Sequence, residues 1–376
     1  TAANHPTLGS GTYLFNSLTV QSGAALTMSG CETTVTNMLA CAGSLVFSGS
    51  EALYLTGDCD FTGGSVTATN STVYISGEGP QSIDFGNCVF AKVTVDKAGS
   101  AAEIDFTDHG FKAGVFRCTA TNMITMAFAA GETYEFTQCY LNGGGNNRYI
   151  RLGSSVTGEK WKLKLSENTQ GMSGVRVSDS DASVGATAYA GATGENEGNN
   201  VNWDFTSDVA SWIGGESGDF TDGANWSGGT APKAGTVVSI IAGDGESIAV
   251  TIPVGTNAAF ASLLMMAGDD GSAMLTAKGT IDVSGTVTMG DGGTLALDAY
   301  DDDGEAPNRI GGDLTVQSGG MVTHTGPAAL ENAKLHLAVT GNVVVDEGGS
   351  IDVTGKEYSE NNGPGGSGWF ESQAYG

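Results

Sequence analysis

Short runs of alternating apolar and polar residues, separated by small polar turns, extend over most of this chain of 376 residues. Between residue 13 and about residue 165, the runs are three to eight residues long and the turns contain two to six residues. A period of two places successive side chains on opposite faces of a strand. No stretch combines a helical period with a capping residue before it, so we predict an all-β protein.

One phrase of this pattern occurs twice. Residues 18–30 read LTVQSGAALTMSG, residues 314–326 read LTVQSGGMVTHTG, and eight of the 13 positions are identical. Looser copies begin at Lys92, Gly279 and Gly341. Recurrence of a strand–turn–strand unit is typical of a solenoid, in which each coil buries a face on the next coil. We therefore predict a right-handed parallel β-helix, with a β-sandwich as the alternative.

Aromatic residues divide the pattern into two parts. Trp203 and Phe205 close the first part, and Trp212, Phe220 and Trp226 are available to cap a second stack of coils. We predict three segments: a cysteine-containing β-helix segment at 1–205, a second β-helix segment at 206–355 and a Gly-rich loop or tail at 356–376.

The net charge of the chain argues against two classes of binding partner. Lys and Arg number 15 against 42 Asp and Glu, a formal net charge of -27, and 23 of the acidic residues lie in 206–376. Such a surface repels the phosphates of nucleic acids and anionic membranes, so we expect neither as a partner. No apolar run reaches the roughly 18–20 residues that a membrane span needs. The acidity instead indicates a secreted or cell-surface protein.

All six cysteines lie in the first 139 residues. They are Cys31, Cys41, Cys59, Cys88, Cys118 and Cys139. Spacings of 20 to 30 residues place the last four in successive coils, where strands about 4.8 Å apart allow disulfides. The alternative is a ladder of buried free thiols that pack as small apolar side chains.

Two sequence patterns resemble known proteins. The pattern W-x-G…G-x-F-x-D-x-x-N-W-S-x-G…P at 212–232 resembles the start of passenger-type β-helical units in bacterial autotransporters. The Gly-rich pattern at 311–366, like VSDSDAS…GNNVNWDF before residue 206, resembles repeats of secreted bacterial adhesins of the filamentous-haemagglutinin kind. These resemblances imply a parallel β-helix, export, and a structural or adhesive role. The six cysteines depart from the pattern, because such passengers usually have few or none.

Parallel β-helices also include polysaccharide lyases and glycoside hydrolases, which need converging carboxylates or carboxylate-bound Ca²⁺ beside a basic residue. The candidate carboxylates are Asp58 with Asp60, Asp179 with Asp181, Asp269 with Asp270, and Asp301 to Asp303. Carboxylates in Gly-rich turns or opposite an inward cysteine are ordinarily solvated. We therefore expect no catalytic residue and no required cofactor. Asp179, Asp181, Asp301 and Asp303 remain weak candidate ligands for Ca²⁺.

Lys160, Lys162 and Lys164 alternate along one strand, with Trp161 on the opposite face. Such a face can contact an acidic glycan, although pairing with acidic residues on the next coil is the commoner outcome. Trp369 is a further candidate for stacking on a sugar.

We expect a non-catalytic extracellular structural or adhesive module of a large secreted or cell-surface bacterial protein. Its partners would be other copies of itself, neighbouring repeats or glycans, and open coil ends would permit end-to-end fibres. The alternatives are a polysaccharide-active β-helix enzyme and a passive glycan-binding module. Coplanar exposed Trp or Tyr rings along one face would indicate the glycan-binding module.

Overall fold

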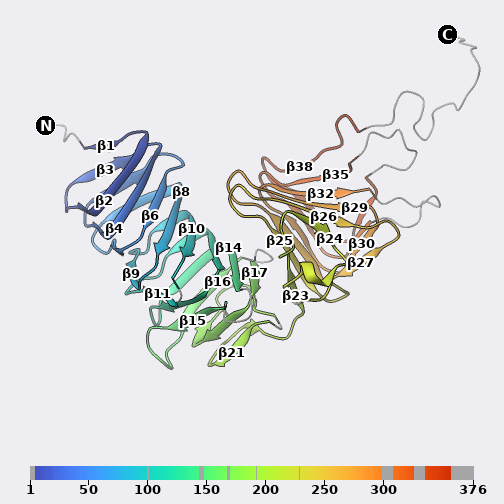
Figure 1. Cartoon of the computed structure of the whole chain (residues 1–376), viewed down its shortest axis with the longest axis horizontal. Coiled ribbons are helices and arrows are strands. Elements are labelled where there is room, and N and C mark those ends of the chain that lie inside the picture. The colour runs from blue at the N-terminus through green and yellow to red at the C-terminus, as the bar shows by residue number, and fades with distance from the viewer. Residues whose placement is uncertain are drawn as a thin grey trace, which may run out of the picture. The chain divides into compact units, whose positions relative to one another are not determined.

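The computed structural model describes residues 5–99, 101–143, 148–166, 170–191, 193–227, 229–298, 308–325 and 335–356, except the side chains of Thr69 and Ala101. The chain divides into two compact units, unit 1 (Thr1–Ser207) and unit 2 (Asp208–Gly376). Both consist almost entirely of strands (Figure 1). In the described ranges the one helix is a short 3₁₀ turn, η1 (Gly223–Asn225).

Unit 1 is a solenoid of parallel strands, 20 of which form one continuous sheet. These strands are β1 (Thr7–Leu8), β2 (Gly11–Val20), β3 (Ala25–Met28), β4 (Cys31–Cys41), β5 (Ser44–Phe47), β6 (Ala52–Leu55), β7 (Asp58–Asp60), β8 (Ser65–Gly77), β9 (Gln81–Asp84), β10 (Val89–Lys97), β11 (Ala101–Phe106), β12 (Lys112–Ala120), β13 (Met123–Phe128), β14 (Thr133–Gly143), β15 (Ile150–Ser154), β16 (Trp161–Leu165), β17 (Gln170–Ser173), β18 (Val175–Ser178), β19 (Ser180–Asp181) and β21 (Glu195–Gly198). A separate pair is formed by β20 (Ala188–Tyr189) and β22 (Trp203–Asp204).

Strand partners in unit 1 lie one coil apart. Glu32 of β4 pairs with Ala52 of β6, and Ala52 pairs with Thr72 of β8, so each of these coils spans 20 residues. Lys112 of β12 pairs with Glu135 of β14, which is a coil of 23 residues. Parallel pairing through successive coils confirms the predicted β-helical solenoid and excludes the β-sandwich.

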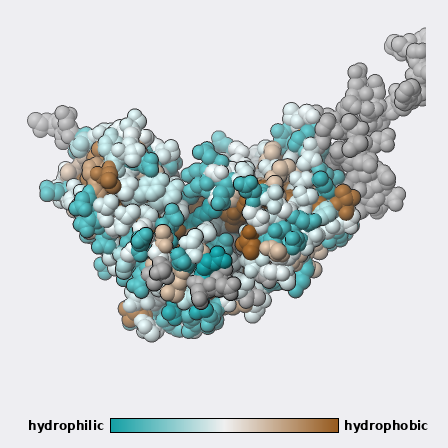
Figure 2. All heavy atoms as spheres, viewed as in Figure 1, coloured by the Kyte–Doolittle hydropathy of each residue, from teal (hydrophilic) through white to brown (hydrophobic). Residues whose placement is uncertain are grey.

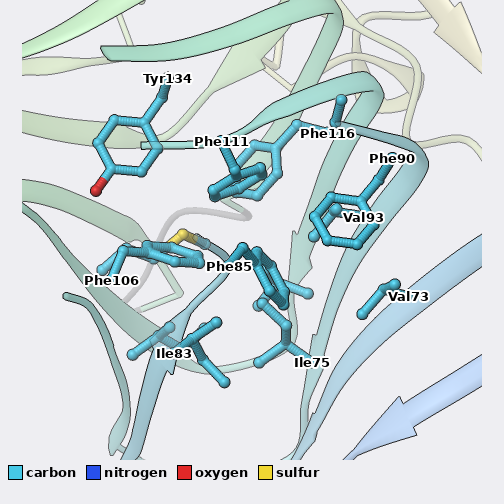
Figure 3. Close-up of a cluster of buried hydrophobic side chains, with 14 of the residues drawn as sticks. Val73, Ile75, Ile83, Phe85, Phe90, Val93, Phe106, Phe111, Phe116 and Tyr134 are labelled. Atoms are coloured by element: carbon cyan, nitrogen blue, oxygen red, sulfur yellow. The ribbon is translucent and has the colours of Figure 1, made fainter. Parts of the chain in front are cut away.

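The interior of unit 1 is a stack of aromatic and branched side chains (Figure 3). Phe111 lies at its centre, within ring-centroid distances of 5.1 Å of Phe85 and 5.3 Å of Phe106. Phe116 of β12 and Phe136 of β14 stack with their ring centroids 4.4 Å apart. Each coil therefore contributes rings that contact rings of the next coil, as aromatic pairs prefer at such distances.

Unit 2 is a second parallel solenoid, with three sheets of six, six and four strands. The first sheet contains β23 (Val209–Ser211), β25 (Val237–Ile241), β28 (Ser262–Met266), β31 (Val287–Met289), β34 (Leu314–Val316) and β37 (Val343–Val345). The second contains β24 (Ser217–Asp219), β26 (Ser247–Ile252), β29 (Ser272–Ala277), β32 (Gly293–Leu297), β35 (Met321–Thr323) and β38 (Ser350–Ile351). The third contains β27 (Asn257–Phe260), β30 (Thr280–Val283), β33 (Asn308–Ile310) and β36 (Leu337–Val339).

An aromatic group occupies the first coil of unit 2. Trp226 is fully buried, and its ring lies edge-on to those of Trp212 at 5.2 Å and Phe220 at 5.0 Å. Phe220 in turn contacts Phe260 of β27 at 5.7 Å. These residues close the apolar interior at the start of the stack, in the position that the sequence pattern predicts for a cap.

The repeated phrase has the same local structure in both units. Each copy forms two strands of one coil, β2 and β3 in unit 1 and β34 and β35 in unit 2. The turn between them has a 2.9 Å backbone hydrogen bond in both copies, donated by Ala24 N to Gln21 O and by Gly320 N to Gln317 O. Its third residue has a positive φ, 78° at Gly23 and 75° at Gly319. Only glycine adopts that conformation readily, which explains the glycine in the phrase.

The face seen in Figure 2 is mainly hydrophilic, with separate apolar side chains rather than one broad apolar area. Within the described ranges, the structure has no helix with the length and apolar character of a membrane span.

Candidate functional site

All six cysteines are buried free thiols in the structure. Their strand register does not place any two of them opposite each other: Cys59 pairs with Leu39 and Ile83, and Cys118 pairs with Val95 and Leu141. Burial raises the pKa of the Cys59 and Cys118 thiols well above the ordinary value, and raises that of Cys88 to about 11. These three side chains are therefore neutral at physiological pH, and the six buried thiols pack as small apolar groups, the arrangement of the free-thiol alternative.

The carboxylates of Asp179 and Asp181 make local hydrogen bonds. Asp179 Oδ1 accepts from Asn199 Nδ2 at 2.7 Å, and its Oδ2 accepts from Gly158 N at 3.1 Å. Asp181 Oδ1 accepts from the side chain and backbone of Ser183, which lowers the pKa of Asp181. In the part of the chain that the structure describes, no three His, Cys, Asp or Glu residues form a group able to hold a metal ion. Asp301 and Asp303, the other Ca²⁺ candidates, lie outside the described residues.

The three lysines of the predicted basic face lie on the outer side of the solenoid, and Trp161 between them is buried. Lys160 Nζ donates to Asn199 Oδ1 at 2.5 Å. Lys162 is the register partner of Asp181 on the next coil. Trp369, the other glycan candidate, lies outside the described residues. The lysines thus face polar or acidic groups of adjacent coils rather than solvent alone.

A ladder of alternating charge, which we call the charge ladder, crosses three coils at this face. Glu135 of β14 is the register partner of Lys112 on β12 and of Lys164 on β16. Its carboxylate lies 2.9 Å from Lys112 Nζ and 3.1 Å from Lys164 Nζ. The two lysines lower the pKa of Glu135. Cross-strand pairing of this kind stabilises neighbouring strands.

Two tyrosines form a stack on the outer face. Tyr54 of β6 and Tyr74 of β8 are register partners, with ring centroids 4.6 Å apart and an interplanar angle of 8°. Each ring covers one face of the other. The arrangement is that of a cross-strand aromatic pair.

One arrangement was not identified from the sequence: a carboxylate–histidine pair on neighbouring coils. Asp84, at the end of β9, is 3% exposed, and its Oδ2 lies 3.1 Å from Nδ1 of His109. This hydrogen bond raises the pKa of His109, with further contributions from the charges of Glu132 and Asp108. The His109 side chain is 38% exposed, so its ring reaches solvent while Asp84 holds its orientation. Such a pair can act as a general base or simply stabilise the coil.

The backbone around this pair has unusual conformations. Asn87 and Asp108 have φ values of 62° and 59°, in the left-handed region that few residues other than glycine adopt. Such residues recur at functional sites as well as in tight turns. The segment TDHG at 107–110 marks this turn in the sequence, but nothing in it identifies Asp84 as the partner of His109.

Glu51 is a second residue that sequence reasoning did not select. It is 1% exposed, and its carboxylate accepts hydrogen bonds from Gly30 N at 3.0 Å, Gly49 N at 2.9 Å and Ser71 Oγ at 2.9 Å. Burial alone would raise the pKa of Glu51, but these hydrogen bonds outweigh it and lower the pKa. Since the donors come from three successive coils, Glu51 joins them in one network.

Lys97 is a buried cation at the end of β10. It is 2% exposed and donates from Nζ to Gly79 O at 2.7 Å and to Gln81 Oε1. Gln81 in turn donates from Nε2 to two backbone carbonyls, Leu55 O at 2.9 Å and Gly57 O at 2.6 Å. Burial lowers the pKa of Lys97 to about 8. The Lys97 side chain thus also links successive coils.

Comparison with protein-family models, curated proteins and solved structures finds no match for this chain.

Proposed function

We propose that this chain is a non-catalytic structural and adhesive module of a large secreted or cell-surface bacterial protein. The observation that carries the proposal is the use of charged side chains to connect coils. Glu51 bonds to groups 21 and 20 residues away, Gly30 and Ser71, and Glu135 bridges two lysines on the coils at either side. Polar groups that connect coils in this way stiffen the stack and limit local unfolding of single coils. A structural spacer requires both properties.

Charge and sequence pattern support an extracellular role. A net charge of -27 keeps long modules soluble and limits their lateral association. The resemblance of 212–232 and 311–366 to units of bacterial surface proteins points to the same setting. Adhesion would use the outer faces of the coils, among them the face that carries Lys160, Lys162 and Lys164.

Electron microscopy and limited proteolysis test the structural role. We expect rigid particles and slow cleavage of residues in the described strands, because their backbone groups are bonded to two neighbouring coils. Rapid cleavage within β6 to β14 under native conditions, or particles without a rigid form, would contradict a spacer function.

The Asp84–His109 pair favours one second candidate, a polysaccharide-active enzyme. The purified chain would be incubated with acidic and neutral polysaccharides, and new reducing ends and unsaturated sugar products would be measured. Under the structural proposal we expect no turnover. Turnover that is abolished by His109→Gln, but retained by the matched variant His5→Gln, would establish the enzyme instead.

A further inference from the structure

Three polar side chains from three successive coils of unit 1 meet near its surface. Lys160 directly precedes β16, Asp179 lies between β18 and β19, and Asn199 directly follows β21. Trp161 pairs with Ser180, so Lys160 and Asp179 occupy the same position of adjacent coils. Asn199 is exposed, Lys160 is half-buried, and Asp179 is 9% exposed. The Asn199 side chain therefore reaches across the coil of Asp179 to the coil of Lys160.

The amide of Asn199 contacts both charged groups. Its Oδ1 accepts a hydrogen bond from Lys160 Nζ at 2.5 Å, and its Nδ2 donates to Asp179 Oδ1 at 2.7 Å. The amide carbon is one C=O bond, about 1.2 Å, beyond the oxygen that Lys160 contacts. An amine can act as a nucleophile at this carbon, and a carboxylate at the nitrogen can transfer a proton to the leaving group.

Backbone hydrogen bonds hold the three groups in this arrangement. Asp179 N donates to Gly198 O at 3.1 Å, Asp179 O accepts from Trp161 N at 3.0 Å, and Asp179 Oδ2 accepts from Gly158 N at 3.1 Å. Asp179 and Asn199 have φ values of 52° and 57°, in the left-handed region. Residues other than glycine recur in such conformations at reactive sites. Reactants held in contact react far faster than the same groups free in solution.

A second lysine–amide contact in unit 1 has carbonyl groups in place of the carboxylate. Lys97 Nζ donates to Gln81 Oε1, and Gln81 Nε2 donates to two backbone carbonyls at 2.9 Å and 2.6 Å. A carbonyl oxygen is too weak a base to carry a proton to a leaving amine. We therefore expect no reaction at Gln81, and the carboxylate of Asp179 distinguishes the Asn199 contact from an ordinary hydrogen bond.

We propose that Lys160 and Asn199 form a covalent isopeptide bond, with Asp179 as the catalytic proton carrier. The lone pair of the neutral Lys160 amine attacks Cγ of Asn199, and the C=O electrons move to Oδ1. Asp179 takes a proton from the amine and passes it to Nδ2. The bond between Cγ and Nδ2 then breaks, ammonia leaves, and the carbonyl forms again. One C–N bond replaces another, so the reaction needs no oxidant.

The bond would join residues that are 39 positions apart and would span the coil between them. A cross-link of this kind restricts the unfolded chain and prevents complete separation of the joined coils. It goes beyond the proposed structural function, because its chemistry depends on neither secretion nor adhesion.

Mass spectrometry of the full chain tests the bond. After refolding from urea, the wild-type chain should lose the mass of one ammonia, about 17 Da, as the amide exchanges its nitrogen. A proteolytic digest should contain two peptides joined at Lys160 and Asn199. The joined peptides distinguish the bond from ring closure within one asparagine, which also releases ammonia.

Two lysine variants provide the matched comparison. Lys160→Arg should yield no joined peptides, because a guanidinium group stays protonated and is not a nucleophile. Lys162→Arg changes the next outward lysine of the same face and should yield the joined peptides as wild type does. Circular dichroism would verify that both variants are folded.

Asp179→Asn separates the proton transfer from folding. Asparagine is among the residues that adopt a left-handed conformation most readily, and its amide oxygen can still accept a hydrogen bond, so this variant should fold. Formation of the bond should be at least about a hundredfold slower than in wild type, because general acid–base catalysis typically contributes that much. The rate would be measured from the appearance of the joined peptides after refolding.

A folded wild-type chain without joined peptides would overturn the bond and leave the structural function intact. Equal rates in wild type and Asp179→Asn would contradict the role of the carboxylate, as would peptides joined at Lys97 and Gln81. Polysaccharide turnover dependent on His109 would remove the proposed structural function and would not affect the bond.

Discussion

The two units fill similar parallel coils with different side chains. Ten of the twelve largest fully buried side chains belong to unit 1, and the other two, Trp226 and Phe220, belong to the aromatic cap of unit 2. Beyond that cap, the interior of unit 2 consists mainly of Val, Leu, Ile, Met and Ala. Parallel coils can therefore stack around an aromatic interior, as in unit 1, or around a mainly aliphatic interior, as in unit 2.

The units also differ in their buried polar groups. Unit 1 buries the charged side chains of Glu51, Asp84, Lys92, Lys97 and Asp179. In the described part of unit 2, the buried polar side chains are those of Thr236, Ser239, Thr288, Asn308, Thr323 and His324. Acidic and basic groups therefore connect the coils of unit 1, and the stability of unit 1 should depend more on the pH.

Removing the central ring of unit 1 should give the largest difference between the unfolding transitions of the two units. Phe111 contacts six other rings, those of Phe85, Phe90, Phe106, Phe116, Tyr134 and Phe136. Phe111→Ala should lower the free energy of unfolding of unit 1 by about 3–5 kcal/mol, because a large cavity remains in a dense stack. Differential scanning calorimetry would follow the unfolding transitions of the two units.

The matched change in unit 2 is Leu295→Ala, in the aliphatic interior of β32. Leu295 is fully buried, and its loss should cost about 2–5 kcal/mol in the unit 2 transition only. A single transition that both substitutions shift equally would contradict the description of the two cores as separate.

Changing the buried carboxylate of unit 1 tests the expected pH dependence. Glu51→Gln directs an amide group toward donors from Gly30, Gly49 and Ser71, so the unit 1 transition should lose about 1–3 kcal/mol at neutral pH. The pKa of Glu51 is lower in the folded protein than its ordinary value of 4.5. The stabilisation by Glu51 is therefore complete above about pH 4.5 and is lost as the pH falls through the folded pKa.

Urea unfolding at pH values from 3 to about 7 would measure this effect in wild type and Glu51→Gln. The two proteins should converge in stability at the acid end of the range, whereas the unit 2 transition should be the same in both. A constant difference at all pH values would show that Glu51 acts through packing rather than through its charge.

The sequence pattern predicted the repeating part of this architecture but, apart from the pairing of the lysine face with acidic residues, not the contacts between coils. Alternation placed Asp58 and Asp60 on the face opposite Cys59, because a strand imposes a period of two on its side chains, and in the structure Cys59 is the buried residue of the three. It also placed Trp161 on the face opposite the flanking lysines, and the structure shows that the Trp161 face is the interior.

Contacts between coils depend on coil length, which varies along the chain. Asp84 and His109 are 25 residues apart, whereas the donor Gly30 lies 21 residues from Glu51. A difference of a few residues decides which side chains meet, and turns of variable length hide that difference in the sequence. The Asp84–His109 pair and the Glu51 network therefore became visible only from the register of the strands.

The smallest expected difference concerns the outer surface of unit 1. Glu135→Gln removes the central charge of the charge ladder, whose lysines are about half exposed. Because solvent and salt screen such pairs, the loss should be below about 1 kcal/mol in the unit 1 transition, and smaller at high salt. Glu103→Gln, at an exposed position of β11, is the matched control and should have a smaller effect at low salt. Equal effects of the two variants at every salt concentration would mean that the charge ladder makes no specific contribution to the stability of unit 1 beyond the general repulsion of an acidic surface. The buried groups would then be the main polar links between coils.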